Sequence, residues 1–383
     1  MLSRVNETMF DLLRMAFMPP VSSFVLKQKL SDEEWNCLHD EAVKQLLVGI
    51  LYRAIQKLPL EIRPPMDLIF QWASEAETVK GQNARLNGVA ASLTQMFAER
   101  GYKTAILKGA ANARLYPDPC MRQVGDIDLW VDGEREGLIA LVESMGFVID
   151  KKSLRSAYHF HFENKVRGIL VEIHYKPSSG CYSPFVRKRI WDFLEKEIQK
   201  QELVPEGFYV PTIKFALVMQ LAHIQKHLLD AGIGFKQIVD YFVLLQNASE
   251  ADRVDVAEIL KKFRLGKTAA ALMWVLERII GLEKSKMICN PDERLGKKML
   301  EDVILSGNFG FSKTWYGENF IWRWLKKKFR FFETFCFAPS EVMWHELDYW
   351  KFFLKSIPMR IRLGKISVWD EFHDKRRYEK KNP

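Results

Sequence analysis

The sequence predicts an α+β protein in which a small mixed sheet is flanked by helical regions before and after it. Apolar residues recur at helical spacing over residues 1–100, alternate as in strands between residues 101 and 180, and return to helical spacing after that. The 383 residues, 48% of them hydrophobic, exceed the usual size of one core, so we expect two or three packed units.

The N-terminal region, residues 1–100, is expected to be a helical layer. Ser31 and Glu34 form a capping-box pattern, and the apolar residues after them predict one helix that reaches Leu51. A second, long helix is predicted from Asp67, which follows two prolines, to residue 100, where Gly101 ends it.

Residues 101–180 are expected to form the sheet. Four short runs have the composition of strands, at residues 104–108, 126–131, 157–163 and 169–175. A short helix is predicted at residues 110–116, a longer one at about 132–145, and a turn at Arg167-Gly168.

Residues 181–310 are expected to be a helical region that binds the substrate or closes over it. The apolar period predicts helices at about residues 211–229, 236–245 and 254–280.

The C-terminal region, residues 311–383, is basic and aromatic. It interleaves two kinds of side chain, namely Trp315, Trp322, Trp324, Phe329, Phe331 and Phe332 with Lys326, Lys327, Lys328 and Arg330. Three interpretations stay open: a closing helical layer, a surface that contacts the acceptor or nucleic acid, and a helix that lies on a membrane surface. Residues from about Asp374 onward are expected to be disordered.

The net charge of +9 and the isoelectric point near 9.1 favour a polyanionic partner. Nucleic acid, a nucleoside triphosphate or a membrane surface would each fit. The five cysteines are odd in number and widely spaced, so they predict reduced thiols and no disulfide or zinc framework. Because the sequence shows no signal-peptide pattern and no stretch long enough to span a bilayer, we expect a cytoplasmic protein.

Two aspartates in one predicted strand carry the main chemical signal. Residues two apart face the same side of a strand, so Asp126 and Asp128 present two carboxylates to one surface. Carboxylates this close raise each other's proton affinity unless a cation neutralises them. Mg²⁺ prefers oxygen ligands and is held by one or two carboxylates together with substrate phosphates, so the pair predicts a magnesium site. The alternative is a pair of solvated surface carboxylates.

The residues around this pair favour the magnesium site. Gly109 lies at a predicted strand-to-helix junction, where free backbone N–H groups can receive a phosphate. Lys108 and Arg122 are candidate cations for the same phosphates. Glu172 lies in an apolar strand, where an isolated carboxylate would be costly without a metal or a partner.

This order of elements resembles the DNA polymerase beta-like nucleotidyltransferase superfamily. The fuller pattern, Leu107-Lys-Gly109, Leu115-Tyr116, Arg122, Asp126-Ile-Asp-Leu129 and Val171-Glu-Ile-His174, is similar to a largely uncharacterised bacterial nucleotidyltransferase-like family. The resemblance is specific over residues 101–175 and looser over the flanking helices, where His223 and residues 235–240 fit the helical part of the family.

The resemblance implies a role for each matching residue. Gly109 would approach the triphosphate, Asp126 and Asp128 would bind the metal ions, and Glu172 would share a metal and help to deprotonate the acceptor hydroxyl. The superfamily usually follows its glycine with Ser or Gly, whereas this sequence has Ala110, which removes a hydroxyl contact to phosphate.

Further polar residues are weaker candidates. His174, near Glu172 in the same strand, is a candidate for orienting the acid or the substrate. As an alternative, the spacing of His159, His161 and His174 would allow a small metal site. Candidate substrate contacts in the helical region are His223, four residues before His227, and Lys236 with Asp240; packing or a helical i,i+4 pair would also account for them.

Together these features predict a magnesium-dependent nucleotidyltransferase. The enzyme would transfer a nucleoside monophosphate from a nucleoside triphosphate such as ATP to the hydroxyl of a small molecule, a protein or an RNA. The alternative is a non-catalytic nucleotide- or RNA-binding protein that keeps the same fold.

Overall fold

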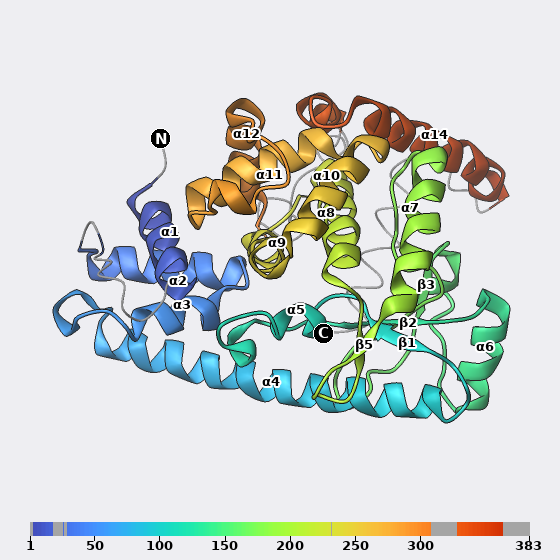
Figure 1. The fold of residues 1–383 in the computed structure, drawn as a ribbon, viewed down its shortest axis with the longest axis horizontal. Coiled ribbons are helices and arrows are strands. Elements are labelled where there is room, and N and C mark those ends of the chain that lie inside the picture. The colour runs from blue at the N-terminus through green and yellow to red at the C-terminus, as the bar shows by residue number, and fades with distance from the viewer. Residues whose placement is uncertain (1–2, 18–25, 27–28, 231, 308–327, 363–383) are drawn as a thin grey trace.

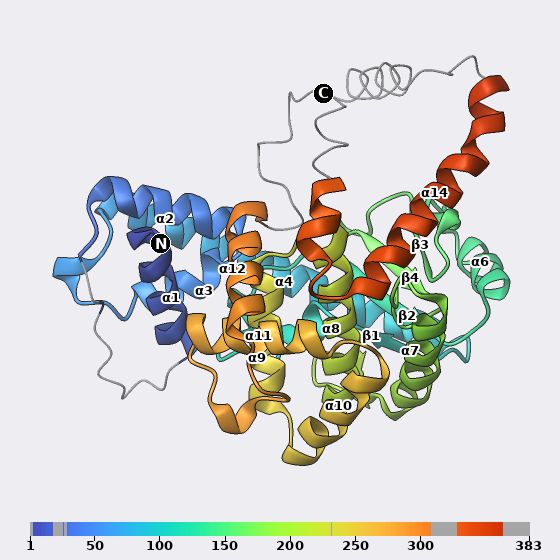
Figure 2. The ribbon, with the colours of Figure 1, turned by 90° about the horizontal axis from the view of Figure 1, so that it is seen from above.

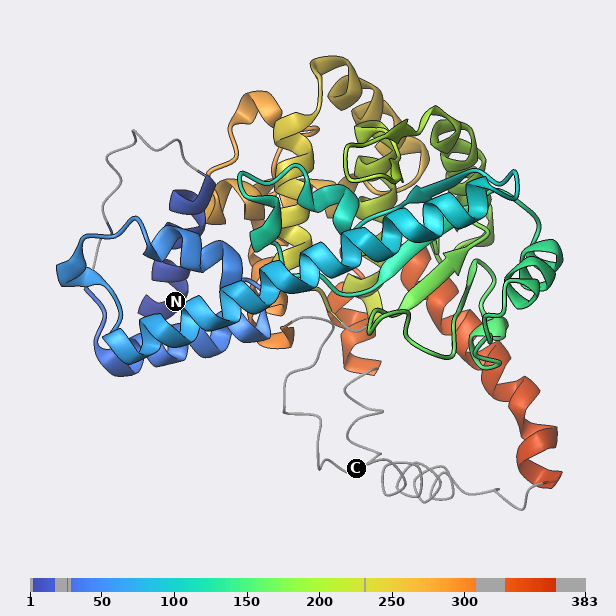
Figure 3. The ribbon, with the colours of Figure 1, turned by 90° about the horizontal axis from the view of Figure 1, so that it is seen from below.

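The computed structural model describes residues 3–17, 26, 29–230, 232–307 and 328–362 of the chain. Four helices form the N-terminal layer: α1 (Arg4–Phe17), α2 (Asp32–Lys44), α3 (Val48–Ile55) and α4 (Met66–Ala98). The long helix α4 contacts α3 near its start and strands β1 (Thr104–Ile106) and β2 (Ile127–Val131) near its end, so it runs beneath both parts of the molecule (Figures 1 and 3).

The capping box at the start of α2 is confirmed, but the single helix predicted as far as Leu51 is wrong. Ser31 accepts a hydrogen bond from the Glu34 N–H, and the Glu34 side chain accepts one from the Ser31 N–H. The helix then stops, and α3 begins at Val48, because Leu46 adopts a left-handed backbone conformation with φ of 57°. Helix α4 matches the predicted long helix within two residues.

The sheet has four strands in the order β1-β2-β4-β3, where β3 is His159–His161 and β4 is Val171–His174. Strand β2 pairs in parallel with β4, and the two edge pairs are antiparallel. The register places Asp128 directly beside Glu172 and Trp130 beside His174. All four predicted strands are present, and the mixed sheet is confirmed.

Each face of the sheet packs against a different core. Ile127, Leu129 and Val131 belong to a cluster with α4 and helix α6 (Arg135–Ser144). Trp130, on the other face of β2, belongs to the larger cluster of the helical region. The face that carries Asp128 is therefore the face that the C-terminal helices cover.

Short helical elements and turns lie between the strands and elsewhere in the chain. Helix α5 (Ala110–Ala113) follows β1, and the chain makes single 3-10 turns at η1 (Leu60–Ile62), η2 (Pro119–Met121), η3 (Ser153–Arg155), η4 (Ile198–Lys200) and η5 (Lys284–Lys286). Arg167 and Gly168, with φ of 49° and 83°, form the predicted turn between the bridged residues Val166 and Ile169.

The helical region contains more elements than the sequence predicts. The prediction omitted α7 (Pro184–Glu197), the hairpin of β5 (Glu202–Leu203) with β6 (Tyr209–Val210), and α12 (Glu293–Ser306). Helices α8 (Ile213–Asp230) and α9 (Phe235–Asn247) agree with it. The single helix predicted at 254–280 is wrong: α10 (Glu250–Lys262) and α11 (Gly266–Ile279) are separated where Arg264 has a φ of 56°.

The last described segment is helical at residues 328–334 and again in α14 (Pro339–Arg362). Val342, near the start of α14, packs against Leu229 of α8, and the helix then extends away from the other helices (Figure 2). Several apolar side chains of the segment are exposed, namely Phe329, Phe332, Met343, Leu347, Trp350 and Leu354. Trp315, Trp322, Trp324, Lys326, Lys327 and the tail from Asp374 lie outside the described residues. Within the described part of the chain, none of the helices combines the length and the apolar character needed to cross a bilayer.

Candidate active site

Three acidic or basic side chains meet on the sheet face that the helices cover. Asp128 on β2 and Glu172 on β4 lie side by side in the parallel register. His174, two residues after Glu172 on the same face, places its Nε2 atom 3.1 Å from Asp128 Oδ1 and 3.5 Å from Glu172 Oε2. Burial opposes the positive charge of this ring, but its hydrogen bonds to Asp128 and Glu172 raise the pKa of His174 to about 9.

Lys108 supplies a second cation to Asp128. It follows β1, which pairs with β2, and its Nζ atom lies 3.1 Å from Asp128 Oδ2. Burial alone would raise the pKa of the Asp128 carboxyl, but Lys108 and His174 hold it well below its ordinary value. Asp128, with only 3% of its side chain exposed, is therefore ionised in the folded protein.

The pKa of Asp126 indicates that the cluster carries more negative than positive charge. The negative charge of Asp128 and then burial raise the pKa of Asp126 above its ordinary value. The negative charges of Asp128, Asp126 and Glu172 all act on Lys108, and His174 pairs with Asp128 and Glu172. The carboxylates of Asp126, Asp128 and Glu172 are oxygen donors of the kind that Mg²⁺ prefers, so a dication fits both the donor set and the remaining negative charge.

Gly109 stands beside this cluster at the end of β1. Its φ of 67° lies in the left-handed region, and a Cβ atom built there would be 3.7 Å from the backbone oxygen of Asp126. The glycine therefore supports a turn that brings the backbone ahead of α5 next to the aspartate pair.

Arg122 forms a two-pronged ion pair with Asp240. Its Nε and one terminal nitrogen donate to the two carboxylate oxygens of Asp240 on α9, each at 2.7 Å, and Tyr116 donates to the same carboxylate at 2.7 Å. Arg122 is 3% exposed. The structure thus joins Arg122, which the sequence assigned to phosphate, with Asp240, which it assigned to substrate. Asp240 is therefore the partner of Arg122, and it does not form the helical i,i+4 ion pair with Lys236.

The remaining candidates lie on α8 and α9. The rings of His223 and His227 meet edge to face, with their centroids 4.3 Å apart. Burial and then neighbouring positive charge lower the pKa of both residues, for His227 to about 4. Burial and then Arg122 lower the pKa of Lys236 to about 8. All three side chains are half-buried, and the charges of Lys108 or Asp126 contribute to their pKa shifts, so they lie near the acidic cluster.

Two residues near the cluster were missed from the sequence. Lys226 of α8 places its Nζ atom 5.0 Å from the ring centroid of Tyr158, whose own ring lies 6.1 Å from that of His174. Neither residue belongs to a recognisable spacing pattern, because the contact joins a loop before β3 to a helix more than sixty residues later.

Among the comparisons with known proteins, a family model identifies the family of this chain. No curated protein matches the sequence. A solved structure similar to this chain is an antigenic nucleotidyltransferase-like protein from Paracoccidioides brasiliensis, at 17% identity, with 46% of this chain and 88% of that chain covered and a TM-score of 0.29. A family model described as an uncharacterised nucleotidyltransferase matches residues 31–281, which is more than half of the chain and includes every site residue named above. The chain belongs to this uncharacterised nucleotidyltransferase family.

Proposed function

We propose that this protein transfers a nucleoside monophosphate from a nucleoside triphosphate to an acceptor hydroxyl in a magnesium-dependent reaction. The observation that carries the proposal is the register of β2 with β4, which sets Asp128 beside Glu172 on the face covered by the helices. Asp126 adds a third carboxylate, and its pKa is raised mainly by the negative charge of Asp128. Simple docking of a nucleotide does not require three converging carboxylates.

The three carboxylates would hold Mg²⁺. When bound, Mg²⁺ supplies charge stabilisation for the entering and leaving oxygens of the transferred phosphoryl group. His174 acts as a positioning residue, because its hydrogen bonds to Asp128 and Glu172 fix both carboxylates. Glu172 would accept the proton of the acceptor hydroxyl.

The triphosphate would lie along the turn at Gly109. Because this residue has no side chain, the backbone can approach a phosphate closely, and Lys108 next to it is a candidate phosphate contact that already neutralises Asp128. Arg122 would act here through Asp240, by holding α9 against the residues that precede β2. His174, His223, Lys236 and Asp240 remain candidate contacts or supports for the acceptor.

The acceptor would be a small molecule, a protein or an RNA. That the family belongs to the DNA polymerase beta-like superfamily stays a prediction. All five cysteines are free, which supports a reducing compartment such as the cytoplasm. A non-catalytic nucleotide- or RNA-binding protein is the competing proposal, favoured by Ala110 in place of the usual Ser or Gly.

The decisive experiment compares Asp126→Asn and Asp128→Asn with the wild type and with Asp132→Asn, an exposed aspartate just after β2. Purified protein would receive Mg²⁺, each labelled triphosphate and a panel of sugars, proteins and RNAs. We expect Asp128→Asn to lower transfer by about 100-fold or more, because loss of a metal-stabilised transition state costs several kcal/mol. Asp132→Asn should retain transfer.

Asp126→Asn gives a second, independent readout. Removing its charge relieves repulsion with Asp128, so we expect a higher melting temperature without metal together with weaker binding of the Mg²⁺–triphosphate by calorimetry. Equal transfer by wild type and Asp128→Asn would refute the assigned site. Magnesium-dependent triphosphate binding by a wild type that labels no acceptor would favour the non-catalytic alternative.

A further inference from the structure

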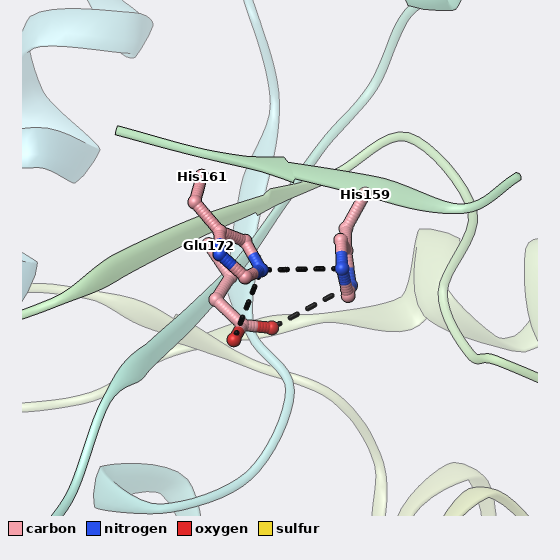
Figure 4. A group of neighbouring side chains, drawn as sticks. All are labelled: His159, His161 and Glu172. Carbon is pink, nitrogen blue, oxygen red and sulfur yellow. Dashed lines mark hydrogen bonds and ion pairs between the residues drawn. The ribbon is translucent and has the colours of Figure 1, made fainter. Parts of the chain in front are cut away.

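A second cluster lies at the edge of the same sheet, where β3 pairs with β4. His159 and His161 are two residues apart, so both face the side that carries Glu172, and the register places His161 directly beside Glu172. Figure 4 shows the two rings and the carboxylate turned toward one another. The Nε2 atoms of the two histidines are 3.2 Å apart, and His161 Nε2 lies 3.3 Å from Glu172 Oε1.

These separations match the edges of a metal coordination sphere. Zinc binds histidine nitrogen and carboxylate oxygen at about 2.0–2.2 Å, so two ligand atoms of a tetrahedral site are roughly 3.3–3.5 Å apart. One ligand atom from each of the three residues lies within 4.8 Å of the other two. We propose that His159, His161 and Glu172 bind a transition-metal dication of the Zn²⁺ or Co²⁺ class, with water in the open position.

The exposure of the three side chains supports an open site. The side chains of His159 and Glu172 are 15% exposed and that of His161 is 27% exposed. The cluster is therefore held firmly by the sheet but can be reached by an ion and by water. Three protein ligands with a free position are the usual arrangement of a metal that can also contact a substrate.

The donor set separates this site from the magnesium site of the proposed function. Imidazole nitrogen suits Zn²⁺, Co²⁺ and similar ions, whereas Mg²⁺ prefers oxygen. Glu172 stands between the two sites, since Oε1 is 3.3 Å from His161 Nε2 while Oε2 is 3.5 Å from both His159 Nδ1 and His174 Nε2. The inference depends on the proposed function only through this shared carboxylate, which would link the occupancy of the histidine site to the acidic cluster.

The test uses full-length protein without a histidine tag, stripped of metal with a chelator and titrated with Co²⁺. We expect one equivalent to bind and to produce the visible absorption of four- or five-coordinate Co²⁺. Zn²⁺ should displace it, and excess Mg²⁺ should not. His159→Ala and His161→Ala should each weaken Co²⁺ binding by about 10-fold or more, since the loss of only an outer-shell partner already costs that much.

His345→Ala, which removes a histidine of α14 outside the cluster, is the matched control and should bind Co²⁺ as the wild type does. Circular dichroism of each variant checks that it is folded, and His161→Asn serves as a second substitution if His161→Ala does not fold. Absence of Co²⁺ binding, or equal binding by the wild type and the folded histidine variants, would overturn the proposal.

Asp128→Asn separates the two proposals. It removes a ligand of the magnesium site and none of the histidine site, so Co²⁺ binding should persist while Mg²⁺–triphosphate binding is lost. If Co²⁺ binds but no triphosphate does, the proposed function fails and the histidine site stands. If the triphosphate binds with Mg²⁺ and Co²⁺ does not bind, the histidine site alone is refuted.

Discussion

Lys236 is a single residue whose charge the fold makes unfavourable. Burial, and then the positive charge of Arg122, lower the pKa of this lysine to about 8 from its ordinary value of 10.5. Below pH 8 both the folded and the unfolded chain carry the proton, and the folded chain bears the full cost of burying it. Between pH 8 and 10.5 the unfolded chain binds more protons, so the free energy of unfolding rises with pH.

We therefore expect Lys236→Met to be more stable than the wild type at pH 7. This advantage should shrink as the pH rises through 8 and should be gone near 10.5, where the wild-type lysine is neutral in both states. Urea unfolding at several pH values measures the difference. Lys267→Met, on the exposed side of α11, should show no such trend. A Lys236→Met variant that is less stable at pH 7 would contradict the unfavourable charge.

At the residue scale, the alternation of side chains along a strand was enough to predict which acidic residues share one face of the sheet. Asp128 and Glu172 lie in apolar strands, Asp126 directly precedes the strand of Asp128, and a period of two fixes which residues of a strand share a face. The partner of Arg122 was not predictable in this way. Asp240 is 118 positions away, on a helix whose packing depends on the whole fold, and no local pattern encodes that distance.

At the element scale, helix ends depend on backbone conformations that some residues signal and others do not. The turn at Arg167-Gly168 was predicted because glycine favours a positive φ. The breaks at Leu46 and Arg264 were missed because these residues adopt a positive φ without any glycine, so the apolar period runs through each break unchanged. Elements with a weak amphipathic pattern, such as the β5–β6 hairpin, were missed for lack of a period.

The Arg167-Gly168 turn supports a prediction of its own. Both residues have positive φ in a two-residue connection, where Asn-Gly is the preferred pair. Arg167 is exposed, so Arg167→Asn should relieve left-handed strain and raise the free energy of unfolding by up to about 1 kcal/mol. Urea unfolding measures the change. Lys165→Asn, at an exposed position without a positive φ, is the control and should not stabilise. Destabilisation by Arg167→Asn would argue against this turn.

At the scale of the whole molecule, buried polar contacts tie the sheet region to the helices. Arg122 and Tyr116 both bind Asp240 of α9, and Asn112 of α5 exchanges two hydrogen bonds of 2.9 Å with Gln220 of α8. The sequence predicted a sheet between two helical regions, and the structure agrees. The sequence did not predict which helices cover the acidic face, because side chains from distant segments determine that packing.

The Arg122–Asp240 pair tests this connection. Asp240→Ala leaves a buried guanidinium without its partner, so we expect the free energy of unfolding to fall by about 3–5 kcal/mol in urea titrations. Arg122→Met combined with Asp240→Leu removes both charges and should recover most of that loss. If the double variant is no more stable than Asp240→Ala, the ion pair is not what couples the two regions.

The same double variant decides how Arg122 serves the nucleotide. Its guanidinium nitrogens donate to both oxygens of Asp240, so we expect Arg122 to act by holding α9 in place and not by touching phosphate. A stable double variant should therefore bind the Mg²⁺–triphosphate within about threefold of the wild type in calorimetry, a difference of less than 1 kcal/mol. Direct contact of Arg122 with phosphate predicts a much larger loss, since a charge-assisted hydrogen bond to phosphate would disappear even though the fold is intact. A loss of about 100-fold in a folded double variant would return Arg122 to the phosphate-binding role that its place before the aspartate strand first indicated.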